Sequence, residues 1–209
     1  MSFKNLPNQI TGIRFLLALI YFGILIALES ANWGNRRLLL LDISIVLFLL
    51  CAGTDWLDGY FARKYNAITV FGRIADPMVD KILICGSFVF LAGLPETQNF
   101  IYPWIAVLVL AREFMIDGIR GFIESQGIPF PSLWGGKLKM GFQCAAVAVT
   151  LVYVSHFREF QLIRGVGDIV IHALIWVTLG LTVYSAYEYL QKASKLLSPF
   201  DAKKNSSST

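Results

Sequence analysis

Charged residues are scarce in this chain of 209 residues. Only 15% are Asp, Glu, Lys or Arg, against roughly 25% in an average soluble domain. The three cysteines match neither a zinc motif nor a disulfide framework. The net charge is only +4, and no stacking aromatic residues are interleaved with the basic ones, so nucleic acid is not an expected partner. These shortages exclude a large soluble domain and a disulfide-stabilised secreted fold.

Long apolar segments are what the sequence has in abundance, since 56% of the residues are hydrophobic. Several segments approach the roughly 20 residues that a helix needs to cross a bilayer. We expect an all-α polytopic membrane protein in which residues 1–197 form one six-helix domain and residues 198–209 a polar, disordered tail. The expected spans are 10–28, 38–62, 76–94, 101–123, 140–156 and 169–191.

The basic residues are distributed unequally between the two ends of these spans. Six spans place both termini on one side, and that side carries 14 of the 18 Lys and Arg residues. Basic residues accumulate on the cytoplasmic side of membrane proteins. We therefore expect both termini in the cytoplasm and a multi-pass protein of a membrane such as the bacterial cytoplasmic membrane, with membrane lipids as its surroundings.

Four aspartates gather where the second expected span ends and the third begins. Asp55 and Asp58 are three residues apart, and Asp76 and Asp80 are four apart, so each pair lies on one helical face. Asp76 is expected as the N-cap of the third span with Pro77 in its first turn, or the helix starts earlier and bends at Pro77. Because ionisable groups at membrane depth face a cavity or one another, we predict a polar cavity open to the cytoplasm and walled by the second, third and fourth spans.

Carboxylates without His or Cys are typical ligands of Mg²⁺ or Mn²⁺, and also of Ca²⁺. Four of them can hold two ions, which can neutralise charge during displacement at phosphorus. Two other interpretations stay open for these aspartates. They can form structural ion pairs with Arg63, Arg73 or Lys81 in an inert membrane scaffold, or they can mark the path of a divalent-cation transporter.

The stretch from residue 54 to residue 81 resembles the signature of the CDP-alcohol phosphotransferase family. It reads Asp55-x2-Asp58-Gly59-x2-Ala62-Arg63-x8-Gly72-x3-Asp76-x3-Asp80, with every fixed position present. The resemblance implies a six-span enzyme, commonly a homodimer, that transfers the phosphatidyl group of a CDP-linked lipid to an alcohol and releases CMP.

The resemblance also implies roles for single residues. The four aspartates bind two divalent ions, and Asp80 is the general base on the acceptor hydroxyl. The nucleotide and metal site that binds CDP-diacylglycerol is lined by Asp55, Asp58, Gly59, Ala62, Arg63, Gly72 and Asp76. The chemistry of two residues fits these roles, because Gly59 lets a nucleotide approach the backbone and Arg63 can donate two hydrogen bonds to a phosphate.

Four further pieces are similar to bacterial phosphatidylglycerophosphate synthases, a branch of this family. They are "NLPNQITGIRF", "GRIADPMVDK", "LAREFMIDGIRGF" and "GGKLKMGFQ", with Met140 where those enzymes often have Thr. The similarity implies glycerol 3-phosphate as the acceptor. Inositol phosphate, or phosphatidylglycerol in a cardiolipin-forming reaction, stays open as an alternative.

An anionic acceptor needs fixed cations near the catalytic pocket. The candidate residues for its phosphate are Arg112, Arg120, Lys137 and Lys139, which also fit a role as membrane anchors. Glu113 and Arg120, seven residues apart, are expected to pair on one helical face. Asn8, Thr11 and Arg14 begin the first span on the same side and are candidates for minor contacts with nucleotide or phosphate, or for helix capping.

Overall fold

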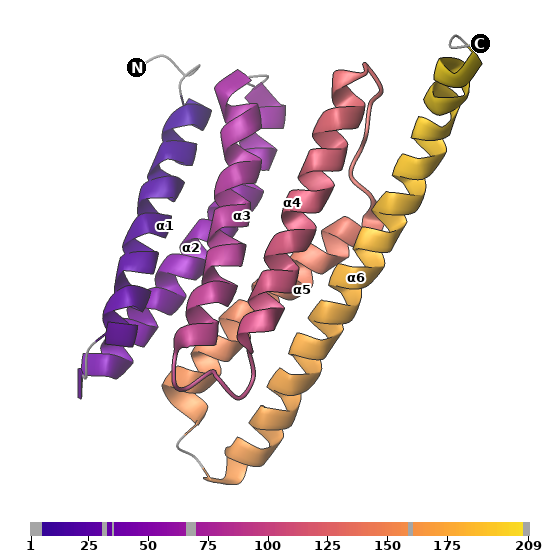
Figure 1. The fold of residues 1–209 in the computed structure, drawn as a ribbon. Coiled ribbons are helices and arrows are strands. Elements are labelled where there is room, and N and C mark those ends of the chain that lie inside the picture. The colour runs from indigo at the N-terminus through magenta and orange to yellow at the C-terminus, as the bar shows by residue number, and fades with distance from the viewer. Residues whose placement is uncertain (1–5, 31–32, 35, 66–69, 159–160, 207–209) are drawn as a thin grey trace.

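The described part of the chain is a bundle of six long helices (Figure 1). The computed structural model describes the backbone of residues 6–30, 33–34, 36–65, 70–158 and 161–206; within these ranges the side chains of 6–10, 55–65, 70–76, 161–164 and 199–206 are not described. The helices are α1 (Leu6–Ser30), α2 (Arg36–Tyr65), α3 (Val70–Gly93), α4 (Pro103–Ser125), α5 (Trp134–Val152) and α6 (Gln161–Ser206). The sequence-based expectation of six helices is therefore confirmed.

Five of the six helices begin earlier than expected, α3 and α5 among them. α3 starts at Val70 and not at residue 76, so Asp76 is not its N-cap and Pro77 lies inside the helix. An interior proline removes one backbone hydrogen bond, and the packing of α3 between α1 and α4 outweighs this loss. α5 starts at Trp134, six residues before the expected boundary. In both cases the polar residues before the apolar run belong to the helix.

The last helix is much longer than the expected span. α6 continues to Ser206 and includes most of the segment from residue 198 that was expected to be disordered. The segment includes Ala202, Lys203 and Lys204, and Ala and Lys are good helix formers. α6 therefore runs the whole length of the bundle and ends at the end where α1 begins (Figure 1).

Four helical segments are long and apolar enough to cross a membrane. They are Thr11–Ser30, Arg36–Thr54, Trp134–Phe157 and Gly165–Ser198. α4 is not in this set, since it carries Arg112, Glu113, Asp117 and Arg120, and neither is the part of α3 whose side chains the structure describes. Both nevertheless run alongside the other helices through the length of the bundle (Figure 1), and Phe88, Leu91, Ile105 and Val109 from these two helices are fully buried in the common core.

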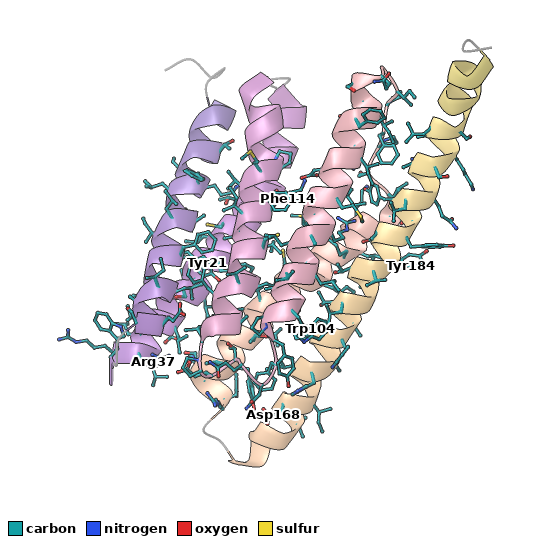
Figure 2. All side chains as sticks on the ribbon, viewed as in Figure 1. Tyr21, Arg37, Trp104, Phe114, Asp168 and Tyr184 are labelled. Carbon is teal, nitrogen blue, oxygen red and sulfur yellow. The ribbon has the colours of Figure 1, made fainter. Side chains whose placement is uncertain are left out.

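The end of the bundle where α2 and α6 begin is closed by polar contacts between elements. Arg37 at the start of α2 donates to Glu96 in the α3–α4 turn at 2.6 Å, and Arg37 and Asp168 both lie toward this end in Figure 2. Burial opposes the ionisation of Glu96, but the hydrogen bond from Arg37, a backbone hydrogen bond and the charges of Arg37 and Arg158 together outweigh burial and hold the pKa of Glu96 below its ordinary value. Asp42 accepts a hydrogen bond from Ser155 in a π-helical turn that follows α5.

α1 and α3 run in the same direction and are joined in the middle of the bundle by a buried hydrogen bond. The hydroxyls of Tyr21 and Ser87 are 2.9 Å apart, and both side chains are fully buried. Tyr21 lies between the two helices in Figure 2. Because a buried hydroxyl without a partner is costly, this contact favours one register of α1 against α3.

Candidate active site

The candidate site lies toward the end of the bundle where α3 and α5 begin and α4 ends. A hollow of about 260 Å³ opens there between these three helices. Its polar lining residues are Asp80, Lys81, Glu113, Lys139 and Gln143. A predicted catalytic carboxylate and a predicted phosphate-binding lysine, 59 positions apart in the sequence, therefore share one hollow.

Asp80 on α3 forms an ion pair with a residue of α1. The Arg14 guanidinium donates to the Asp80 carboxylate at 3.1 Å, and the Arg14 side chain is completely buried. Arg14, predicted only as a minor contact for nucleotide or phosphate, is thus a partner of the candidate base.

The side chains of the other predicted metal ligands lie outside the described residues. The backbone places Asp55 and Asp58 near the end of α2 and Asp76 near the start of α3, at the same end of the bundle. The side chains of the predicted nucleotide-binding residues also lie outside the described part of the chain, as does that of Asn8 on α1. These nucleotide-binding residues are Gly59, Ala62, Arg63 and Gly72. Within the side chains that the structure does describe, no three acidic, His or Cys groups come together to hold a metal, and only Asp80 of the four aspartates is among them.

Glu113 on α4 joins two of the predicted acceptor-site cations. Its carboxylate is 3.1 Å from Arg112 and also accepts a hydrogen bond from Lys139 on α5, and all three side chains are buried. Among the described residues Glu113 pairs with Arg112 and Lys139, so the expected pairing with Arg120 is wrong. Seven residues correspond to about 10.5 Å along a helix, and Lys139 from the neighbouring helix is closer.

Arg112 and Arg120 share a tyrosine of α6. The Tyr189 hydroxyl accepts from Arg120 at 3.1 Å and from the backbone N–H of Leu133 at 2.9 Å. Its ring lies 5.4 Å from the Arg112 guanidinium and 5.7 Å from that of Arg120, within the range of a cation–π contact. Arg112 also donates to Ser185 at 3.0 Å.

The four predicted cations do not all lie in the hollow. Lys139 lines it, Arg112 lies beside it through Glu113, and Arg120 is connected through Tyr189. Lys137 is exposed and lines a separate, mostly apolar hollow of about 430 Å³ with Trp134, Leu138 and Leu174 of α6. Two residues along a helix are a rotation of about 200°, so Lys137 and Lys139 lie on different faces of α5.

The Tyr189 hydroxyl is expected to contribute to stability. Tyr189→Phe leaves Arg120 and the Leu133 N–H without their common buried acceptor, and we expect the free energy of unfolding to fall by about 1–3 kcal/mol. Thermal unfolding in detergent, followed by circular dichroism, measures the change.

The matched control for Tyr189→Phe is Tyr187→Phe on the same helix. The Tyr187 side chain is exposed and its hydroxyl accepts only from Gln191 among the described groups. We expect this second loss to stay within about 0.5 kcal/mol. Equal losses in the two variants would contradict a special role for the buried hydroxyl.

Comparison with known proteins identifies the family of the chain. The family model described as CDP-alcohol phosphatidyltransferase matches residues 4–184. The chain is 34% identical to a Bacillus subtilis protein named CDP-diacylglycerol–glycerol-3-phosphate 3-phosphatidyltransferase, over 90% of this chain and 94% of that protein. Proteins with the same name from Rickettsia felis and Pseudomonas fluorescens are 31% and 30% identical, covering 92% and 90% of this chain and 97% and 90% of their own length. The chain belongs to the CDP-alcohol phosphatidyltransferase family.

Proposed function

We propose that this chain is an enzyme of phospholipid biosynthesis that transfers the phosphatidyl group of CDP-diacylglycerol to glycerol 3-phosphate. The products are phosphatidylglycerophosphate and CMP. The names of relatives that match nearly the whole chain support this assignment. The structural observation that carries it is the hollow that Asp80 and Lys139 line together, because the reaction needs a base for a hydroxyl and a cation for a phosphate within one small acceptor.

Asp80 is proposed as the general base. Its carboxylate accepts the proton of the attacking hydroxyl, whose oxygen forms a bond to the phosphatidyl phosphorus. The bond from this phosphorus to the oxygen of the CMP phosphate breaks, and CMP leaves. The hydrogen bond from the Arg14 guanidinium at 3.1 Å positions this carboxylate for the proton transfer.

Two divalent cations, Mg²⁺ or Mn²⁺, are proposed to bind at the carboxylates of Asp55, Asp58, Asp76 and Asp80. The donor set fits because it consists of oxygen ligands alone, and the backbone brings the end of α2 and the start of α3 to one end of the bundle. When bound, such ions neutralise the charge of a pyrophosphate leaving group. The cytidine nucleotide is proposed to lie against Gly59, Ala62, Arg63 and Gly72.

The acceptor phosphate is proposed to bind at Lys139, with Arg112 and Arg120 supplying further positive charge. These three cations and the carboxylate of Glu113 leave two positive charges, which balance a phosphate dianion. Glu113 and Tyr189 hold these side chains in place before the substrate arrives. Lys137 is a more distant contributor, because it lines a different hollow.

All six helices of the domain 1–197 are proposed to span the cytoplasmic membrane of a bacterium, with both termini in the cytoplasm. α1 begins and α6 ends at the same end of the bundle (Figure 1). The hollow lies toward that end, where CDP-linked lipid and a water-soluble acceptor can both reach it. A homodimeric assembly, implied by the family resemblance, stays a prediction.

A panel of acceptors tests the proposed reaction. Purified protein is incubated with CDP-diacylglycerol, Mg²⁺ or Mn²⁺, and either glycerol 3-phosphate, inositol phosphate or phosphatidylglycerol, and CMP release is measured. We expect release with glycerol 3-phosphate to exceed that with the other acceptors by at least about 100-fold. CMP release with a different acceptor alone would disprove the assignment.

A further inference from the structure

One polar group in the hollow has no role in the steps described above. Gln143 lies on α5, one turn after Lys139, and its side chain lines the hollow that Asp80 and Lys139 share. Only 1% of Gln143 is exposed. Its amide nitrogen is fully buried and has no hydrogen-bond partner in the part of the chain that the structure describes.

A buried amide without a partner is unusual. Most buried polar side-chain atoms in folded proteins are hydrogen-bonded, and leaving one unpaired costs about 1–3 kcal/mol. Ser185, Glu113 and Tyr189 beside the site all have partners. The Nε atoms of Arg112 and Arg120 are unpaired among the described groups, but both side chains hydrogen-bond through their terminal nitrogens, whereas Gln143 has a single nitrogen. The amide of Gln143 therefore indicates a partner that comes from outside the protein and binds in the hollow.

The chemistry of the amide limits what this partner is. A glutamine side chain donates and accepts hydrogen bonds, as does a hydroxyl group. Neighbouring Lys139 and Lys81 only donate, and ionised Asp80 and Glu113 only accept. Gln143 is thus the lining residue that can both donate to and accept from one neutral alcohol group.

We infer that Gln143 binds the acceptor hydroxyl that does not react, and that it selects acceptors carrying this group. The inference rests on the proposed function. With the attacking hydroxyl of glycerol 3-phosphate at Asp80 and the phosphate at Lys139, the hydroxyl on the middle carbon lies between them. A side chain lining the same hollow one turn from Lys139 is in position to bind it.

The test compares two acceptors with two forms of the enzyme. The acceptors are glycerol 3-phosphate and 3-hydroxypropyl phosphate, which lacks only the middle hydroxyl. The wild-type enzyme is expected to prefer glycerol 3-phosphate by about 100-fold or more in kcat/KM, because a site built to bind a hydroxyl rejects an analogue without it. Gln143→Met keeps the length of the side chain and removes both hydrogen-bonding atoms.

In Gln143→Met we expect kcat/KM for glycerol 3-phosphate to fall about 10- to 100-fold. The value for 3-hydroxypropyl phosphate should change less than about threefold, so the preference largely disappears. The KM for CDP-diacylglycerol should stay the same.

Thr150→Val is the matched control. Thr150 is also buried on α5 with a hydroxyl that has no partner among the described groups, but it does not line the hollow. Its loss should leave the acceptor preference unchanged.

The outcomes separate the inference from the proposed function. If wild-type enzyme releases no CMP with glycerol 3-phosphate, the proposed function fails. If the wild-type enzyme turns over glycerol 3-phosphate but does not discriminate against 3-hydroxypropyl phosphate, the role of Gln143 is overturned. An equal fall for both acceptors in Gln143→Met also overturns it and assigns the residue to packing.

Discussion

Asp80→Asn is expected to reduce the transfer rate by about 10²- to 10⁴-fold, the range that a positioned general base contributes. Asparagine has nearly the same shape but cannot take the proton from the attacking hydroxyl. The rate is measured as CMP release at saturating CDP-diacylglycerol and glycerol 3-phosphate. Binding of CDP-diacylglycerol, measured separately by titration, should persist at least in part.

A second substitution separates loss of chemistry from loss of structure. Asp168→Asn changes an aspartate near the opposite end of the bundle, which accepts a hydrogen bond from Tyr153 at 2.5 Å. We expect its transfer rate to stay within about threefold of wild type, because asparagine still offers an acceptor oxygen. Unfolding of the Asp80→Asn protein, or unchanged turnover, would remove Asp80 from the role of base.

Lys139→Met is expected to raise the KM for glycerol 3-phosphate by about 10- to 100-fold, with the KM for CDP-diacylglycerol within about threefold of wild type. The reason is the loss of a buried charge-assisted contact to the acceptor phosphate. Glu113 keeps Arg112 as a partner in this variant, so the fold should persist. Initial rates with each substrate varied in turn give the two KM values.

Lys137→Met is the matched control for Lys139→Met, because it also removes one positive charge, but from a different face of α5. We expect less than about a threefold change in either KM, since an exposed charge at this distance is screened by salt. Similar increases for the two lysine variants would show that the general positive potential, and not a contact in the hollow, binds the acceptor.

Helix number was predictable because six apolar runs of spanning length are separated by turn residues. The starts of α3 and α5 were not, since both helices begin in polar stretches whose place in the bundle is decided by tertiary packing. This boundary error also affected the site. Once α5 is known to begin at Trp134, the helical period separates Lys137 from Lys139 and places Gln143 with Lys139.

The partners of the predicted residues were harder to find than the residues themselves. Tyr189 lies 69 positions from Arg120, and Ser185 lies 73 positions from Arg112. Nothing in the local pattern of α6 distinguishes these two from other small or aromatic residues, and both lie beyond the residues that the family model matches. Gln143 did carry a signal, because an uncharged polar residue inside an apolar run needs a reason to be buried.

The ion pair of Arg14 with Asp80 and the hydrogen bond of Tyr21 with Ser87 join α1 and α3 with the same sequence offset of 66 residues. On each helix the two contacting residues are seven positions apart, so the two contacts lie about 10.5 Å apart along the parallel helices. A shift of α1 along α3 by one helical turn would break both contacts at once. The hydrogen bond between Tyr21 and Ser87 therefore fixes the register in which Arg14 reaches Asp80, although neither hydroxyl lines the hollow.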